Sequence, residues 1–389
     1  MKSKLNLLKE FATRKRTGFV DSIYKSLPDP DKILEENNYD FEIYRDLMSD
    51  PHLMATIQQR KMQVSQMGWE LTCEEETENK IKDNVYEMLR KLPIGKIMSD
   101  TLDAIFFGYS VGEIEYRKTG KLIEPVDVIG KPQEWFIFTK NNELRLRKFN
   151  NGIYLFEEGE KLPEFKFILT QYNPTYVNPY GQRVLSRCYW PVQLKRGGIE
   201  FWQLMMERYG MPYLIGKYPN TFTEVQKAEF LEELQKMVED NITIFEEGLG
   251  IEIKESPQYD IGQLYENLLK FHNKEISKAV LTVTLTIELE GTGSYSASDI
   301  HREMLSYLGV SDKKLVERAL NTLIEYYVKI NFGDACLPKV KLNKKEAVVE
   351  ESAERDKILK DMGVNFTKEY FMKRYNLTEG DFTLLEIRK

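Results

Sequence analysis

The sequence predicts an α+β protein on three observations. Apolar residues recur at helical spacing in several long stretches, turn residues separate alternating runs between positions 110 and 172, and a segment rich in Pro, Asn and Gly divides the two patterns. The chain has 389 residues, 42% of them hydrophobic and 30% charged, which suffices to bury cores in about two or three domains. Its net charge of -7 lies outside the low-hydrophobicity, high-charge range of disordered chains.

The first 40 residues predict an extended arm. They combine a basic stretch, Lys9–Arg16, with a turn-rich sequence around Pro28 and Pro30, and they show little apolar periodicity. A short basic arm is more often solvated or docked on a partner than a reader of nucleic acid.

Residues 41–183 predict a region of helices and strands. Two short helices divided at Asp50-Pro51 precede a strand at 69–73, because the residue before a proline disfavours the helix. Apolar stripes predict two further helices, at 78–92 and 96–108.

Strands follow at 110–117, 134–140, 143–149, 153–158 and 165–172, with a turn expected after the first. The Asn151-Gly152 turn between alternating runs is a strong hairpin signal. Residues 173–181 are dense in Pro, Asn and Gly, so they predict a loop and the main boundary of the chain.

Two long helices with an insert between them are predicted beyond this loop. The first covers 185–209, with Pro191 marking either a kink or its start, and the second begins near Ile261. The insert predicts a strand at 213–218, a helix opened by a Thr223–Gln226 capping box, and a hairpin of 241–247 with 251–256, which gives a β-α-β-β unit.

From Thr282 to Glu290 polar and apolar residues alternate, which predicts an extended segment with two faces. A helix follows from Asp299 to about Gly333, and the remaining sequence to residue 389 is predicted to be charged and helical.

Searches for catalytic motifs find none of the P-loop, zinc-protease, nucleophile-elbow or dinucleotide-binding patterns. The closest is Gly291-Thr292-Gly293-Ser294, which could hold a phosphate, but two neighbouring glutamates favour a flexible loop. The three histidines, His52, His272 and His301, are far apart, so packing roles are favoured over metal ligation.

Composition excludes other classes. A pI of about 5.4 argues against tight phosphate binding. No apolar run is long enough to span a membrane, and no signal peptide is recognisable, so the protein is expected to stay where it is made. Cys73, Cys188 and Cys336 are odd in number and far apart, so neither a disulfide framework nor a zinc site is expected.

Two ordered segments carry a family resemblance. The sequence NPYGQRVLSRCYWPVQLKRGGIEFWQLMMERYGMPYLIGKY resembles the stretch of Mu-like phage portal proteins in which a Pro-Tyr-Gly turn precedes a long helix closed by a Tyr-Gly-Met-Pro turn. The sequence EISKAVLTVTLTIELEGTGSYSASDIHREM resembles the same family's helix, Thr-rich strand, Gly-Thr-Gly-Ser-Tyr turn and His-bearing helix, here with His301.

The resemblance implies the portal-protein fold. Its parts would be an N-terminal arm (1–40), a wing (41–183), a stem of two long helices (184–209 and 259–281), a clip (210–258), a tunnel loop (282–298), a helix returning to the wing (299–335) and a short helical, crown-like C-terminal region (336–389).

It also implies a function, that of a ring of twelve copies at one capsid vertex of the virion, assembled in the host cytoplasm, through which double-stranded DNA is packaged and ejected. The partners would be the terminase large subunit, the major capsid protein and a neck protein, with no membrane, cofactor, metal or catalytic residue. The expected DNA-facing residues are Thr282, Thr284, Thr286, Glu288, Glu290, Thr292 and Ser294. The expected docking residues of the clip are Lys217, Tyr218, Glu246, Glu247 and Lys254.

The alternating face suits a DNA path, because hydroxyl and acidic groups would not hold phosphates and a duplex could slide. Two alternatives remain open. One is a metal-dependent nuclease, which would need a buried acidic cluster. The other is a multimeric scaffold without a DNA channel.

Overall fold

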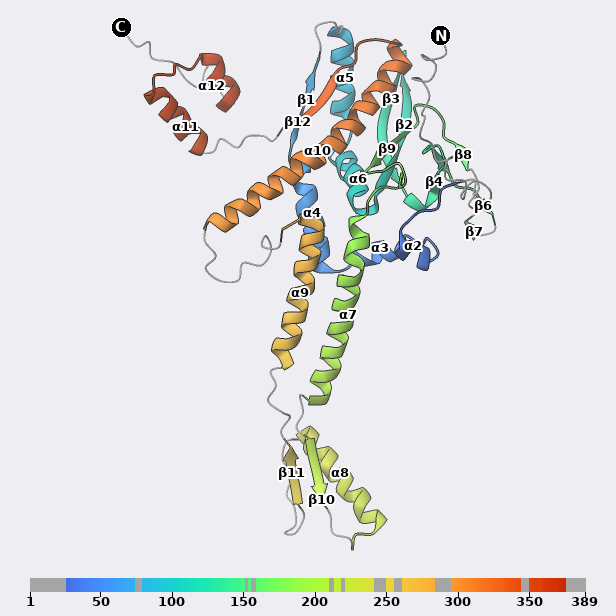
Figure 1. Ribbon diagram of the computed structural model, residues 1–389, viewed down its shortest axis with the longest axis vertical. Coiled ribbons are helices and arrows are strands. Elements are labelled where there is room, and N and C mark those ends of the chain that lie inside the picture. The colour runs from blue at the N-terminus through green and yellow to red at the C-terminus, as the bar shows by residue number, and fades with distance from the viewer. Residues whose placement is uncertain are drawn as a thin grey trace.

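The computed structural model describes residues 26–73, 79–150, 153–154, 159–209, 213–217, 221–240, 250–254, 261–283, 295–343 and 350–375. It is elongated, with three parts along its length (Figure 1). The body holds residues 26–183 and 295–343. The arm consists of helices α7 (Val184–Tyr209) and α9 (Ile261–Leu281), and the distal unit of strand β10 (Tyr213–Lys217), helix α8 (Glu224–Asp240) and strand β11 (Gly250–Lys254).

The helices of the body form where apolar stripes and caps coincide. Asp50 accepts a hydrogen bond from the N–H of Leu53 at 2.9 Å and Pro51 occupies the first turn, which confirms the predicted division at Asp50-Pro51. These helices are α2 (Lys32–Glu36), α3 (Glu42–Leu47), α4 (Pro51–Ser65), α5 (Asn79–Lys91), α6 (Ile94–Phe107) and α10 (Tyr295–Phe332).

The main sheet of the body has strand order β3-β2-β9, all antiparallel. Its strands are β2 (Tyr109–Thr119), β3 (Leu122–Lys131) and β9 (Phe167–Gln171). The expectation of only a turn after the first strand was wrong, because residues 122–131 form β3. This strand contains Pro125, a residue that is unfavourable inside a sheet. The strand lies on a sheet edge, and Pro125 lies next to a register shift between Glu115 and Tyr116, which is a place where a strand tolerates proline.

A second small sheet carries short strands between β3 and β9. Strand order is β4-β5-β8, and a separate pair, β6-β7, lies beside it. The strands are β4 (Phe136–Phe138), β5 (Leu144–Leu146), β6 (Phe149–Asn150), β7 (Ile153–Tyr154) and β8 (Glu160–Lys161).

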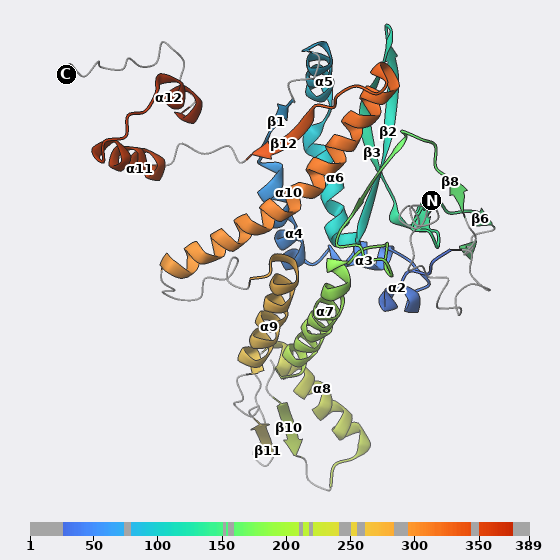
Figure 2. The ribbon, with the colours of Figure 1, turned by 45° about the horizontal axis from the view of Figure 1, so that its top comes forward.

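The C-terminal sequence returns to the body as a strand. β1 (Gly68–Thr72) pairs antiparallel with β12 (Lys339–Asn343), whereas a helix was predicted there. Val340 and Leu342 are buried and the lysines beside them are exposed, so the short alternation in KVKLN decides the conformation. Helices α11 (Glu350–Asp361) and α12 (Lys368–Tyr375) then confirm the helical part of that prediction and lie apart from the body (Figures 1 and 2).

The N-terminal segment is also part of the body from residue 26 onward. Leu27 and Leu34 are buried, Ser26 bridges Thr139, and α2 forms at 32–36, so an extended arm was wrong for these residues. The basic stretch Lys9–Arg16 lies outside the described residues.

The core of the body forms around α10. This helix packs against α4, α6 and the main sheet through an apolar stripe, so that it crosses the whole body (Figure 2). The stripe consists of Val316, Leu320, Leu323, Ile324, Tyr327 and Val328. A smaller core of Leu27, Tyr109, Val111, Phe136, Phe138 and Tyr180 lies under the short strands.

Candidate functional site: the arm, its junction with the body and the distal unit

The arm is an antiparallel pair of helices that carries the distal unit away from the body (Figure 1). The rings of Trp202 and Tyr265 stack with centroids 6.2 Å apart and planes 9° apart. Gly198 lets Leu268 approach closely, since a Cβ there would lie 2.7 Å from its Cδ2 atom. The α7 helix starts at Val184 and runs through Pro191, so the alternative that it begins at the proline was wrong.

A second apolar stripe of α7 is exposed. Trp190, Leu194, Phe201 and Leu204 recur at heptad spacing, and each is 55–66% exposed. On α9, Leu264 and Phe271 are exposed by 69% and 57%. An exposed apolar stripe on a helix that is already packed against another helix is typical of a further contact surface. The arm therefore presents an apolar surface for a further partner.

Three polar contacts hold the arm to the body at α3 and α4. The Lys195 ammonium lies 2.7 Å from the Asp50 carboxylate, and both side chains are at most 10% exposed. The hydroxyl of Ser277 lies 2.8 Å from Nε2 of His52. Arg196 binds the carboxylate of Asp46 at the edge of the same junction. Contacts from both arm helices therefore fix the direction in which the arm leaves the body.

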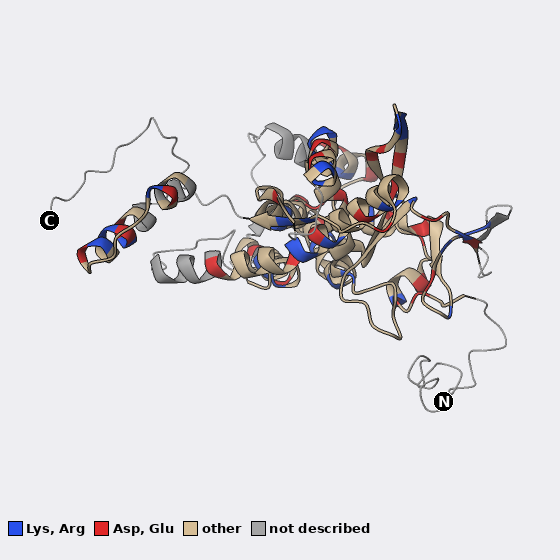
Figure 3. Ribbon diagram, turned by 90° about the horizontal axis from the view of Figure 1, so that it is seen from above, with Lys and Arg blue, Asp and Glu red and all other residues tan. Residues whose placement is uncertain are grey.

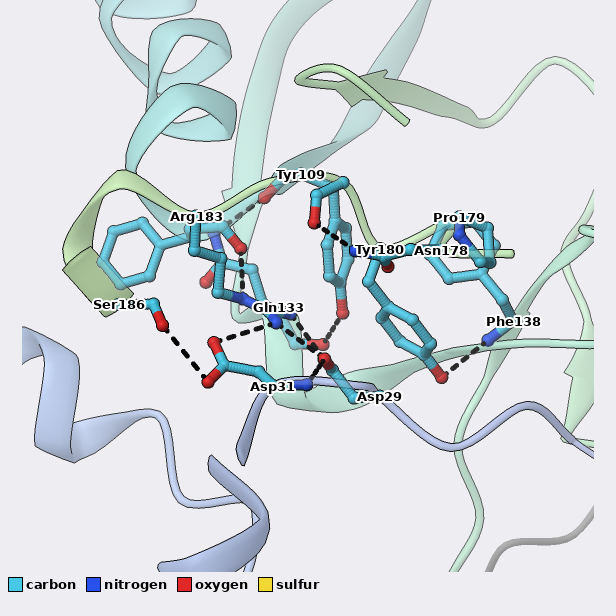
Figure 4. A network of polar contacts seen from close by, with 12 residues as sticks. Asp29, Asp31, Tyr109, Gln133, Phe138, Asn178, Pro179, Tyr180, Arg183 and Ser186 are labelled. Atoms are coloured by element: carbon cyan, nitrogen blue, oxygen red, sulfur yellow. Dashed lines mark hydrogen bonds and ion pairs between the residues drawn. The ribbon is translucent and has the colours of Figure 1, made fainter. Parts of the chain in front are cut away.

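A buried network holds the start of α7 (Figure 4). Arg183 donates to both carboxylate oxygens of Asp29 and, through Nε, to the carbonyl of Phe107 at 2.8 Å. Asp31 accepts a 2.6 Å hydrogen bond from the hydroxyl of Tyr44. Burial alone would lower the pKa of Arg183, but Asp29 and Asp31 more than reverse this, so the pKa is raised and the guanidinium stays charged.

The same network holds the N-terminal segment, because the Tyr180 hydroxyl donates to the carbonyl of Leu27 at 2.7 Å and accepts from the N–H of Phe138. Burial raises the pKa of Tyr180, so the hydroxyl stays protonated and keeps its donor. The segment around Leu27 thus fastens the second sheet to the arm.

The end of α9 is held by Arg60 of α4. Its Nη1 donates to the carbonyl of Val280 at 2.8 Å, and its Nε and Nη2 donate to Asp312 of α10. Its guanidinium also lies 5.6 Å from the centre of the Tyr172 ring. One buried side chain therefore joins α4, α9 and α10. No sequence pattern indicated this contact, since Val280 and Asp312 are both more than 200 positions away from Arg60.

The segment expected to face DNA is described only at its two ends. Thr282 was expected to begin an extended segment, but its φ is 62° and its N–H donates to the carbonyl of Lys278, so it terminates α9. The following α10 begins at Tyr295, four residues before the expected Asp299. The other expected residues, Thr284, Thr286, Glu288, Glu290, Thr292 and Ser294, lie outside the described residues.

The distal unit confirms a strand, a capped helix and a second strand. Thr223 and Gln226 form the predicted capping box, with the N–H of Thr223 donating to Oε1 of Gln226 at 3.0 Å. β10 and β11 pair antiparallel, which places Lys217 opposite Gly250 and Lys254 opposite Tyr213, at opposite ends of the ladder. Tyr218, Glu246, Glu247 and the expected strand 241–247 lie outside the described residues.

Charges of both signs alternate over the upper side of the body rather than forming one patch (Figure 3). Among the described residues there is no group of three His, Cys, Asp or Glu side chains placed to hold a metal ion. His52 and His272 both lie at the junction of arm and body, while His301 falls on α10 with its side chain outside the described residues. None of the helices that the structure describes is long and apolar enough to cross a membrane.

Comparisons with known proteins point to one family. A sequence model described as the portal protein of Mu bacteriophage matches residues 41–377. The portal protein of Escherichia phage Mu is 26% identical over 287 residues, which cover 71% of this chain and 54% of that protein. The Mu-like prophage FluMu protein gp29 of Haemophilus influenzae is 23% identical over 290 residues, with the same coverage. The chain therefore spans about half the length of these curated relatives.

Among solved structures, a chain in the neck of a native gene transfer agent particle, computed with C12 symmetry, superposes with a TM-score of 0.63. The match covers 93% of this chain and 98% of that chain at 10% identity. At this identity the likeness concerns the fold alone.

Proposed function

Since the chain belongs to the family of the portal protein of Mu bacteriophage, we propose that it forms a ring at one vertex of a phage capsid, through which double-stranded DNA enters and leaves. Membership of this family confirms the resemblance drawn from the two sequence segments. In the finished particle the protein would lie in the virion, and during assembly in the host cytoplasm.

The exposed apolar stripe of α7 is the observation that carries the proposal. Trp190, Leu194, Phe201 and Leu204 are each more than half exposed in the described chain, although α7 already packs against α9. A neighbouring copy offers Leu264 and Phe271 of its α9, so repetition of one contact would bury both stripes and close a ring. The twelvefold symmetry of the neck particle with the same fold supports twelve copies.

In such a ring the body would be the wing, the arm the stem and the distal unit the clip. The clip would dock the terminase large subunit during packaging and a neck protein afterwards, with Lys217, Tyr218, Glu246, Glu247 and Lys254 on the docking surface. The body would contact the major capsid protein, and α11 with α12 would form a small crown.

DNA would pass the segment between α9 and α10, with Thr284, Thr286, Glu288, Glu290, Thr292 and Ser294 facing it and Thr282 at its root. This set contains no cation, so each phosphate would pass without being held. The ring would supply the passage, and the terminase would supply the energy. We expect no catalytic activity of the chain itself.

Light scattering together with negative-stain imaging of the purified protein tests the ring. A particle of about a dozen copies with an open axial channel is the expected result. A monomer at every salt concentration would contradict the proposal.

The DNA path and the docking surface need separate tests. Deletion of residues 286–294 should leave the ring intact and reduce the DNA packaged or retained in particles, whereas unchanged packaging would reject this segment as the DNA path. Reversal of charge at Lys217 and Lys254 together should weaken terminase binding by the ring. The same double reversal at Lys118 and Lys121, two exposed lysines of the body, changes the charge by the same amount and serves as the matched control.

A further inference from the structure

Two cysteines far apart in the sequence meet at one end of the β1–β12 ladder. Cys73 follows Thr72, whose ladder partner Lys339 is the first residue of β12, and Cys336 comes three residues before Lys339. In sequence they are 263 positions apart (336 − 73), which is why their spacing indicated no pairing.

The pleat puts both thiols on the same face. Trp69 and Leu71 pair with Leu342 and Val340, and all four contribute to the core of the body. Since side chains alternate along a strand, Cys73 continues the face of Trp69 and Leu71. By the same alternation Cys336 continues the face of Val340 and Leu342, so the two are diagonal neighbours across the ladder end.

Neither cysteine is fixed by the ladder. Its last pair is Thr72 with Lys339, and Pro338 between Lys339 and Cys336 has no N–H to extend it. Diagonal neighbours have Cα atoms roughly 7–8 Å apart, and a disulfide needs about 4.4–6.8 Å. The Cα atoms of Cys73 and Cys336 therefore have to approach each other by only about 1 Å for a disulfide to form.

The chemistry of the two sites agrees with this placement. Both thiols are free and partly exposed. The pKa of Cys73 is raised, chiefly by burial, with Lys82 opposing the shift and the nearby thiol of Cys336 adding to it. Mutual electrostatic influence requires the two sulfur atoms to be close.

We propose that Cys73 and Cys336 form a reversible disulfide with a small-molecule disulfide such as oxidised glutathione as the oxidant. One cysteine thiolate attacks the oxidant and releases one glutathione thiolate, leaving a mixed disulfide. The second cysteine thiolate attacks the protein sulfur of that mixed disulfide and releases the second glutathione. The protein loses two electrons and two protons, and the oxidant is reduced to two thiols.

The bond would tie β1 to the segment that joins α10 to β12. It would close a loop that contains most of the chain, and a cross-link of that length restricts the unfolded state most. Cys188 cannot substitute for either partner, because it is completely buried and burial raises its pKa to about 12. The proposal does not depend on ring formation.

Titration of the native protein with oxidised glutathione, followed by alkylation in denaturant and mass spectrometry, tests the pair. The expected result is loss of two of the three thiols, a mass lower by two hydrogen atoms, and one cross-linked peptide that contains Cys73 and Cys336. The thermal unfolding midpoint of the oxidised protein should rise and return on reduction.

Variants separate this outcome from others. Cys73→Ser and Cys336→Ser should each abolish the intramolecular bond and the rise in midpoint, while Cys188→Ser should leave both intact. Retention of three thiols under these conditions, stable mixed disulfides on both cysteines, or a bond between two copies would each overturn the proposal.

Discussion

Arg60 and Asp312 form a two-pronged ion pair in the core of the body, with donor–acceptor distances of 2.7 and 3.0 Å and both side chains 2% exposed. Burial by itself would lower the pKa of Arg60, and Asp312 more than offsets that, so the pKa is raised. Each charge is therefore tolerated only in the presence of the other.

Arg60→Met should lower the free energy of unfolding by about 3–5 kcal/mol, because it leaves the carboxylate of Asp312 buried without its partner. The double variant Arg60→Met with Asp312→Leu should lose less than the single variant, since no charge remains in the core. Chemical denaturation measures both. Lys96→Met, which breaks the exposed pair with Asp127, is the control and should cost less than about 1 kcal/mol. A double variant with a lower free energy of unfolding than the single variant would contradict this account.

Phe201→Asp or Leu194→Asp should disperse the ring into smaller species. Each side chain is more than half exposed in the single chain, so the fold should survive, but an unpaired carboxylate would be buried between copies. We expect the dissociation concentration to rise at least about tenfold, which corresponds to 1.4 kcal/mol, in sedimentation velocity. Gln203→Asp adds the same charge to the same helix outside the stripe and should leave the ring unchanged. Equal dispersal by both kinds of variant would argue against the stripe.

His272 should make the arm sensitive to acid. It is 6% exposed, its Nδ1 atom has no hydrogen-bond partner among the described residues, and burial lowers its pKa, with Glu275 opposing and Lys195 adding to the effect. The folded state thus binds a proton less readily than the unfolded state, whose value is about 6.5. Its contribution is present above about pH 6.5 and is lost as the pH falls below it.

Thermal unfolding between pH 7.5 and 5 measures this loss. His272→Leu should match the natural protein at pH 7.5 and lose less stability at pH 5, where few carboxylates have begun to titrate. Parallel curves for the two proteins would show that His272 does not control the acid response.

Gly181→Ala should be far more costly than Gly120→Ala, although both glycines have positive φ, of 77° and 62°. A Cβ at Gly181 would lie 2.3 Å from the carbonyl oxygen of Gly108 and 2.6 Å from that of Tyr172, and neither backbone atom can turn away. A Cβ at Gly120 would have no atom of the described chain within 4 Å. We expect losses of roughly 2–4 kcal/mol at Gly181 and about 1 kcal/mol at Gly120 by denaturation. Similar losses at the two positions would mean that the loop at Gly181 moves aside.

The sequence pattern predicted those helices and turns whose local residues favour the same structure that the tertiary packing requires. The division at Asp50-Pro51, the capping box at Thr223 and the two arm helices all depend on residues within a turn or two of one another. The strand at 122–131 was missed because only a turn was expected there; it contains Pro125, and its place at a sheet edge is what permits that proline. The strand at 339–343 escaped because five alternating residues between charged stretches resemble a surface helix.

The sites were less accessible to prediction than the fold. The ion pair of Arg60 with Asp312 and the meeting of Cys73 with Cys336 are products of tertiary packing, and no spacing rule connects residues so far apart. The α7 helix itself was predicted from helical spacing, but its exposed stripe was not, because which side of the helix packs against α9 is decided only in the folded structure.

The pairing of β1 with β12 determines when, during translation, the body can finish folding. Gly68 is made early and its partner Asn343 very late, so this edge of the body stays open while nearly all of the chain is translated. Contacts between such distant positions form slowly and leave strand edges exposed in the meantime. A nascent chain is therefore unable to complete its body, and subunits should join one another only after translation has passed β12.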